Sequence, residues 1–159
     1  MASFAEVESE EPAFAARVKA AFDKHGHKAL ATLRADGSPR VSGIEARFSA
    51  GELWLAGMTR SVKFADLRRD PRMALHSGSD DPDVFTADAK VSGRAIEVTD
   101  PAELAAYAGQ EQVPEELQPF ELFRIDLDQV VLIALSDAKD ALVISSWRPG
   151  QGVTHIRRD

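Results

Sequence analysis

The segment LWLAGMTRSVKFADLRRDPRMAL, which runs from Leu53 to Leu75, changes character twice along its length. It opens as an apolar run typical of a β-strand, passes through a polar elbow at Thr59–Ser61, and closes on a second apolar run. Between the two runs we expect a helix over residues 61–69, because the proline of Asp70-Pro71 disfavours the helical conformation at the residue before it. The segment therefore predicts a strand, an elbow, a short helix and a further strand.

The elbow and the start of this helix have the chemistry of an anion site. A helix N-terminus presents free N–H groups and the positive end of the helix dipole. Ser61 lies at the expected cap position, and hydroxyl and cationic side chains beside it can bond phosphate oxygens. The stretch from Met58 to Arg72 holds five cations against two acids, namely Arg60, Lys63, Arg68, Arg69 and Arg72 against Asp66 and Asp70. The residues alone leave two interpretations open, a phosphate site or a capped helix with a solvated basic face.

The composition narrows the class of protein. The chain has 159 residues, of which 44% are hydrophobic and 28% charged, as in a soluble globular domain. Its net charge of -7 argues against a nucleic-acid partner, and no apolar stretch approaches the roughly 20 residues of a membrane span. The absence of cysteine excludes disulfides and thiolate chemistry. Because the acidic N-terminus lacks the features of a secretory signal, we expect a cytoplasmic protein with no membrane partner.

Further elements are expected on both sides of the segment. The spacing of apolar residues predicts an amphipathic helix over residues 10–24, and Asp36-Gly37 predicts a hairpin turn between two strands. Strands are expected at 52–57, 73–75 and 89–98, and a helix begins at Asp100. Beyond it, two apolar stretches lie on either side of residues 126–128, a strand follows at 141–147, and a short last strand is expected after Pro149-Gly150.

These elements define the expected fold class. They amount to about seven strands and three helices, mostly in antiparallel order, and closing such a sheet into a barrel removes its open edges. We expect one domain over residues 1–159, mostly β with peripheral helices (α+β), built on a barrel of about six to seven antiparallel strands. Residues 1–27 supply an N-terminal helix, 28–98 the first part of the barrel with the elbow, and 99–159 a helix and the remaining strands.

The order of these pieces resembles a known superfamily. A helix is followed by ATLRADGSPRVSGI, ELWLAG, SVK, LRRDPRMAL and KVSGRAIEV, and from about Ala29 to Val98 this order is similar to the pyridoxamine 5′-phosphate oxidase-like, flavin-binding split barrels. The resemblance implies that the elbow holds the phosphate of FMN or of the 5-deazaflavin coenzyme F-420. On this basis the cofactor-binding residues are expected to be Ser42, Gly43, Ile44, Glu45, Met58, Thr59, Arg60, Ser61, Lys63, His76, Trp147 and Arg148.

The resemblance also implies roles outside the elbow. The backbone of residues 42–45 would run along the edge of the flavin ring, and His76 would reach the same cleft. Because the superfamily binds its cofactor at the interface of a homodimer, Trp147 and Arg148 are expected to close over the partner's ring. From the residues alone, Trp147 either stacks on a ring cofactor or packs at a subunit contact, whereas Trp54 is expected in the core.

The elbow differs from that of true pyridoxamine phosphate oxidases. Those enzymes carry Ser-Arg-Lys where this chain has Val62 in the middle, and their second strand supplies cations for which only Arg40 and Arg47 stand in here. We therefore expect an FMN- or F-420-dependent oxidoreductase that transfers hydride to a small organic substrate, rather than an oxidase of pyridoxamine phosphate. No side chain is assigned as catalytic, because the cofactor supplies the redox chemistry.

Two other classes of function remain open. A non-catalytic flavin-binding or stress-related protein would bind the cofactor without turnover. A haem-binding split barrel would need an iron ligand among His25, His27, His76 and His155. The spacing of these histidines favours no metal site, and the acidic loop at 78–83 lacks the ligand spacing of an EF-hand, so we expect no bound metal ion.

Overall fold

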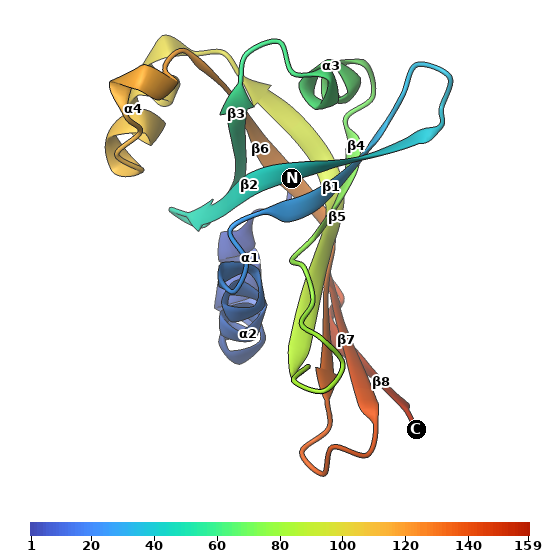
Figure 1. Ribbon diagram of the computed structural model, residues 1–159. Helices are drawn as coiled ribbons and strands as arrows, with labels where there is room; N and C mark the ends of the chain where they lie inside the picture. The colour runs from blue at the N-terminus through green and yellow to red at the C-terminus, as the bar shows by residue number, and fades with distance from the viewer.

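The computed structural model describes residues 1–159 and is built around one antiparallel sheet. The strand order is β3-β2-β1-β4-β5-β6-β7-β8, and an additional pairing of β3 with β6 closes the first six strands into a barrel (Figure 1). The expected antiparallel barrel is confirmed, and β7 and β8 extend the sheet beyond it. The strands are β1 (Lys28–Leu33), β2 (Pro39–Ser49), β3 (Glu52–Met58), β4 (Arg72–His76), β5 (Ala87–Val98), β6 (Phe120–Leu135), β7 (Leu142–Arg148) and β8 (Gly152–Arg158).

The N-terminal region differs from the single helix predicted over residues 10–24. It forms two helices that meet at Glu11, where φ and ψ are -140° and 66°. Pro12 occupies the first turn of the second helix and disfavours helical backbone at the residue before it, so the chain bends there. The helices are α1 (Phe4–Glu10), α2 (Pro12–Asp23), α3 (Val62–Arg69) and α4 (Pro101–Gln110), with a 3-10 turn at Glu115–Leu117.

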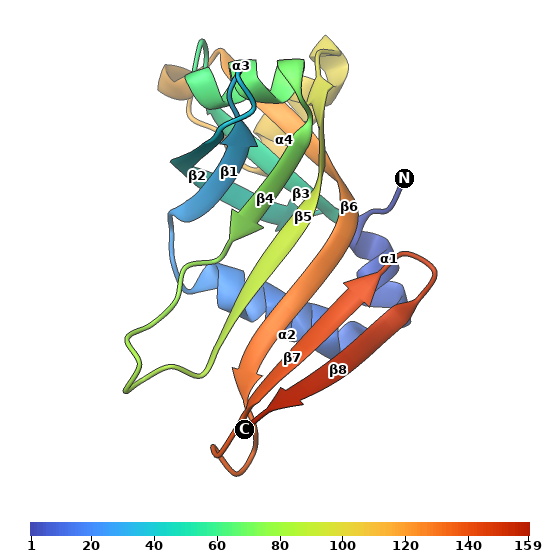
Figure 2. The same cartoon turned by 90° about the vertical axis from the view of Figure 1, so that its right-hand side faces the viewer.

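The main core fills the barrel and continues beneath α1 and α2, which cover one face of the sheet (Figure 2). Three phenylalanines join the helices to β2. The ring of Phe48 lies 4.3 Å from that of Phe4 and 5.2 Å from that of Phe22 between ring centroids. The opposite, outer face of β1, β4, β5, β6, β7 and β8 carries no helix (Figure 2).

The barrel and its extension both depend on β6. This strand pairs with β3 through residues 120–124, with β5 through 122–134 and with β7 through 130–135. The sequence predicts two apolar stretches here, but the structure joins them in one strand of 16 residues. The polar interruption is accommodated because the Asp126 carboxylate accepts a hydrogen bond from the backbone N–H of Ala2 at 2.7 Å.

A second, smaller core lies outside the barrel under α4. Trp54, Val98, Tyr107 and Leu122 form it, and the Trp54 side chain is 8% exposed. Burial raises the pKa of the Tyr107 hydroxyl from its ordinary 10.0 to about 12, because the charged phenolate is disfavoured in this core. The core position expected for Trp54 is confirmed.

A glycine on β5 is required by the close approach of β6. A Cβ atom on Gly93 would lie 2.1 Å from the backbone oxygen of Asp126, whereas a Cβ on Gly43 of β2 would meet nothing within 4 Å. We expect Gly93→Ala to lower the free energy of unfolding by about 2 kcal/mol or more, because the strand backbone must move to relieve the overlap. Gly43→Ala is the matched control, and urea denaturation measures both. Equal stability of the two variants would contradict this account.

Candidate functional site

The elbow follows β3 and leads into α3, which lies across one end of the barrel (Figure 1). Helix α3 begins at Val62 with Ser61 at the N-cap position, as predicted. Phe64 and Leu67 are buried beneath the helix, and the Phe64 ring stacks on that of Phe123, with 4.9 Å between centroids. These contacts fix the helix start against the barrel.

Ser61 does not cap the helix with its side chain. Its backbone oxygen accepts from the N–H groups of Phe64 and Ala65, each at 3.2 Å, but its hydroxyl oxygen is buried and has no hydrogen-bond partner. The N–H groups of Val62 and Lys63 also make no hydrogen bond within the chain. A buried hydroxyl without a partner is rare, because desolvation of an unpaired polar group costs free energy. The helix start therefore has three donors, on three consecutive residues, with no acceptor from the chain.

The elbow itself is an exposed, sharp turn. Arg60 has a φ of 65°, in the left-handed region that is unusual for a residue other than glycine. Met58, Thr59 and Arg60 are exposed. Backbone strain of this kind is concentrated at functional sites and turns, and here it lets the chain reverse between β3 and the start of α3.

The five cations of the segment have different environments. Arg68 pairs with Glu97 and with Glu121, the latter at 2.8 Å. Arg69 pairs with Asp66 at 2.8 Å, and Arg72 with Asp70 at 2.6 Å. Arg60 and Lys63 have no carboxylate within the 4.0 Å that defines an ion pair. The two unpaired cations are therefore those closest in sequence to the unbonded Ser61 hydroxyl.

A buried carboxylate holds α3 in place. Asp66 accepts hydrogen bonds from Thr32 on β1 at 2.8 Å, from Arg40 on β2 at 2.7 Å and from Arg69 at 2.8 Å. Burial on its own raises the pKa of this carboxyl, but the hydrogen bonds from Arg40, Arg69 and Thr32 outweigh it and hold the pKa at about 2. Because Arg40 is occupied by Asp66, it does not substitute for the phosphate-binding cations of the second strand.

This anchor was not predicted from the sequence. The signal was present, because Asp66 lies between Phe64 and Leu67 on the apolar face of the predicted helix, three residues before Arg69. An acid at a core-facing position of a helix needs a buried partner.

The Asp66 network predicts a pH dependence of stability. Its folded pKa of about 2 lies below the ordinary 3.8, so its stabilisation is present above pH about 4 and is lost as the pH falls toward 2. We expect Asp66→Asn to lower the free energy of unfolding by about 2 kcal/mol at pH 7 and the difference from wild type to shrink between pH 4 and 2. Urea denaturation across this range measures it, with exposed Asp128→Asn as control. A difference that stays constant with pH would contradict the assignment.

Strand alternation divides the predicted residues of β2 between two faces. Ser42 pairs with Leu30 and lies on the barrel side with buried Ile44, whereas Gly43 and Glu45 lie on the outer face. The side chains of Ser42 and Ile44 therefore point away from the outer face. The pairing of β2 with β3 ends at Glu45 and Ala56, and past this point the two strands separate beside the elbow (Figure 1).

His76 lies on the same outer face. Ala29 of β1 pairs with Gly43 on one side and with His76 on the other, so Gly43 and His76 are two strands, or about 10 Å, apart. The Gly78 N–H donates to Nδ1 of His76 at 3.0 Å, and its Nε2 lies 3.6 Å from the Asp88 carboxylate. A ring nitrogen that accepts carries no proton, so neutral His76 holds its proton on Nε2.

The structure corrects the prediction for Trp147. Its side chain is fully buried in the main core, and its indole N–H donates to Glu10 at 2.8 Å. It faces α1 and α2, on the opposite side of the sheet from His76, so its ring is not available to stack on a cofactor or to close over a partner. Arg148 is the next residue along the strand, is exposed and points to the outer face.

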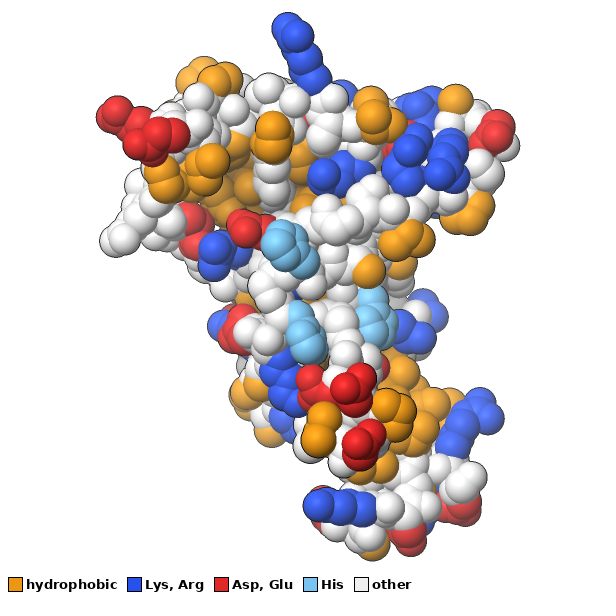
Figure 3. All heavy atoms as spheres, in the orientation of Figure 1, with side chains coloured by type: hydrophobic (Ala, Val, Ile, Leu, Met, Phe, Trp, Pro, Cys, Tyr) orange, Lys and Arg blue, Asp and Glu red, His pale blue; other side chains and the backbone are white.

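Three of the four histidines lie close to a polar side chain of this chain. His25 Nε2 lies 3.3 Å from Asp80, and His155 Nδ1 lies 2.8 Å from the Ser145 hydroxyl. Pale blue histidine side chains lie near one another on the face shown in Figure 3. No group of three or more histidine or acidic side chains is arranged to hold a metal ion, and no helix has the length and apolar character needed to cross a bilayer.

The closed barrel, with a strand, an elbow and a short helix at its end, defines a class of protein, the split β-barrels. A family model described as pyridoxamine 5′-phosphate oxidase matches residues 14–134. The chain belongs to this family, whose members have the flavin-binding split-barrel fold. No curated protein matches the chain.

Solved structures show the same fold. A pyridoxamine 5′-phosphate oxidase-related, FMN-binding protein from Nostoc punctiforme has 16% identity and a TM-score of 0.64, covering 94% of this chain and 96% of that one. ChuZ from Campylobacter jejuni has 13% identity and a TM-score of 0.67. The match covers 98% of this chain and 64% of the ChuZ chain. PhzG from Burkholderia lata, in complex with tetrahydrophenazine-1-carboxylic acid, has 15% identity and a TM-score of 0.59. The match covers 92% of this chain and 86% of the PhzG chain. At these identities the likeness concerns the fold.

Proposed function

We propose that this protein binds FMN through the elbow and acts as an oxidoreductase on a small organic substrate. The observation that carries the proposal is the buried, unbonded hydroxyl of Ser61 at the start of α3. The free N–H groups of Val62 and Lys63 and the unpaired cations Arg60 and Lys63 add donors and charge around it. This donor set suits a phosphate, which brings several acceptor oxygens and negative charge to one point.

Different residues near the elbow would contact different parts of such a cofactor. Ser61 and Lys63 would bond the phosphate, with Thr59 and Arg60 at its exposed side. Gly43 is exposed on the outer face, and no atom beyond its chain neighbours lies within 4 Å of a Cβ placed there, so a flat ring could approach the backbone at this point. When bound, a flavin supplies the hydride chemistry. His76 holds a proton on Nε2 on the same face and is the candidate proton donor.

The ion pairs favour FMN over F-420. The deazaflavin carries an acidic tail of glutamates, which Arg68, Arg69 or Arg72 could receive only if their side chains were free to face it. All three are paired with carboxylates of this chain. Releasing them would leave Glu97 and Asp70 unpaired and would take one of its two arginines from Asp66. FMN has no such tail and needs only the elbow.

Titration of FMN and of F-420 into the apo protein, followed by fluorescence, tests the proposal. We expect saturable binding of FMN, and a loss of about tenfold or more in affinity in the double variant Ser61→Ala/Lys63→Ala, since a charge-assisted bond contributes about 1.5–3 kcal/mol. Arg72→Ala, which removes a paired cation of the same segment, is the control and should bind as wild type does. Unchanged affinity in the double variant would make the elbow a purely structural feature, and tight binding of F-420 alone would change the cofactor.

We further propose that the outer face of the sheet forms a homodimer. Ile133, Ile144 and Ile156 form one row across β6, β7 and β8, and Leu135 pairs with Leu142 beside them. Ile156 is 55% exposed and Leu142 is 38% exposed. Exposed aliphatic rows of this kind mark interaction surfaces. Arg148 lies on the same face and would approach the second subunit.

Sedimentation equilibrium tests the dimer. We expect the wild type to be dimeric and Ile156→Asp to dissociate, because a buried unpaired carboxylate opposes association. Leu117→Asp places the same change at a residue that is 62% exposed outside this face, and it should remain dimeric. A monomeric wild type, or equal effects of the two changes, would contradict the proposal.

Two alternatives have their own outcomes. A non-catalytic flavin-binding protein would bind FMN but would show no turnover with any donor or acceptor. A haem-binding barrel would show haem absorbance that a histidine substitution removes. His155 bonds the Ser145 hydroxyl, and His25 and His76 lie close to Asp80 and Asp88, which gives the haem alternative less support than the flavin.

A further inference from the structure

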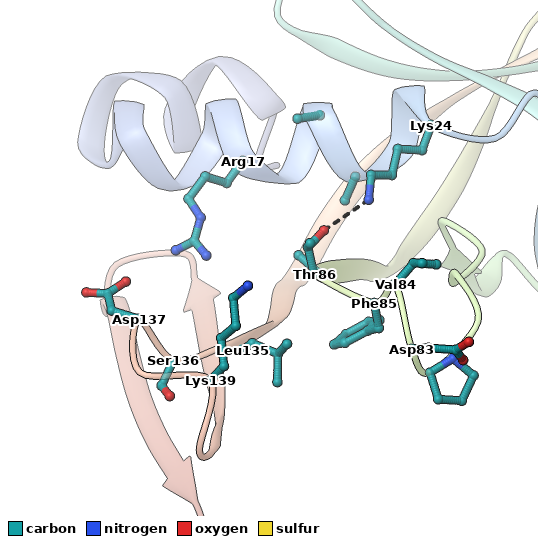
Figure 4. A pocket seen from close by; sticks show the side chains of 14 residues that line it. Arg17, Lys24, Asp83, Val84, Phe85, Thr86, Leu135, Ser136, Asp137 and Lys139 are labelled. Atoms are coloured by element: carbon teal, nitrogen blue, oxygen red, sulfur yellow. Dashed lines mark hydrogen bonds between the residues drawn. The ribbon is translucent and has the colours of Figure 1, made fainter.

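A cavity lies at the end of the molecule away from α3. It is bounded by α2, by the segment before β5 and by the turn between β6 and β7, and its volume is about 660 Å³ (Figure 4). This volume is within the roughly 300–1,000 Å³ of small-molecule sites. No residue of the elbow lines it.

Two cations from distant parts of the chain point into this cavity. The side chain of Arg17 extends from α2, and that of Lys139 extends from the turn between β6 and β7. The charged ends of both face the same space (Figure 4). Neither has a carboxylate within the 4.0 Å of an ion pair. Asp83 and Asp137 also line the cavity without pairing with them. The third cation, Lys24, is already bound to Asp80 at 2.7 Å and to Thr86 at 3.0 Å.

The rest of the lining is largely apolar. Phe85 and Leu135 line the cavity to one side of the two cations (Figure 4), and Ala21 of α2 and Val84 also belong to its lining. Two like charges that face one space repel each other, and an anion bound directly between them relieves this repulsion better than Asp83 and Asp137, which lie beyond 4.0 Å from both.

We propose that this cavity binds a small amphipathic anion, in which a carboxylate, sulfonate or phosphate lies between Arg17 and Lys139 and an apolar body lies against Phe85 and Leu135. The site is independent of the proposed cofactor site, because none of its residues lies in the elbow. An amphipathic organic acid is the class of ligand that meets both parts of the lining.

Fluorescence titration with 8-anilinonaphthalene-1-sulfonate tests the proposal, with N-phenyl-1-naphthylamine as the probe that lacks the sulfonate. We expect saturable binding of the anionic probe, weakened about tenfold in Arg17→Gln/Lys139→Gln, with the neutral probe unaffected by that change. The control Arg34→Gln/Arg94→Gln removes the same charge from exposed residues outside the cavity and should leave both affinities unchanged. Thermal denaturation of each variant confirms that it is folded.

The outcomes separate this site from the elbow. Ser61→Ala/Lys63→Ala should bind the anionic probe as wild type does, whatever its affinity for FMN. Equal binding of the two probes by the wild type would overturn the proposal, as would equal losses in the two charge variants. Loss of the anionic probe in the elbow variant alone would overturn it by placing the probe at the elbow.

Discussion

The buried carboxylate of Asp66 is the interaction on which the position of the elbow depends. It ties α3 to β1 through Thr32 and to β2 through Arg40. A buried charge is stable only when it is fully bonded. The hydrogen bonds of Asp66 therefore fix the position of α3 over the end of the barrel. Because α3 follows the elbow directly, the same network places the Ser61 hydroxyl and the first N–H groups of the helix.

The local elements could be predicted because their signals lie within a few residues. Pro71 ends α3, Asp36-Gly37 turns the first hairpin, and the apolar run before the elbow forms β3. The environment of the cations could not be predicted in this way. Arg68 pairs with Glu97 and Glu121, 29 and 53 residues away, and only the folded barrel brings them together. The sum of charges along the segment therefore overstated the positive charge available to a ligand. Only Arg60 and Lys63 have no paired carboxylate.

Trp147 and Arg148 show where strand reasoning was insufficient. Neighbouring residues on a strand point to opposite faces, so one of the pair had to face inward. Which one was decided by α1 and α2, which cover the face that carries Trp147 and provide Glu10 as its acceptor. The sequence shows the alternation but not which face the helices cover. Arg148, His76 and Gly43 all lie on the outer face. The proposed site therefore lies on one side of the sheet.

The central claim is that the elbow binds a phosphate, and comparison of FMN with riboflavin tests it most directly. The two ligands share the ring and the ribityl chain, and they differ in the phosphate alone. Calorimetric titration of the wild-type protein measures both affinities under one condition. The account predicts that FMN binds at least about tenfold more tightly, because its phosphate gains charge-assisted bonds that riboflavin lacks. Equal affinities would show that the elbow makes no phosphate contact and would contradict the account.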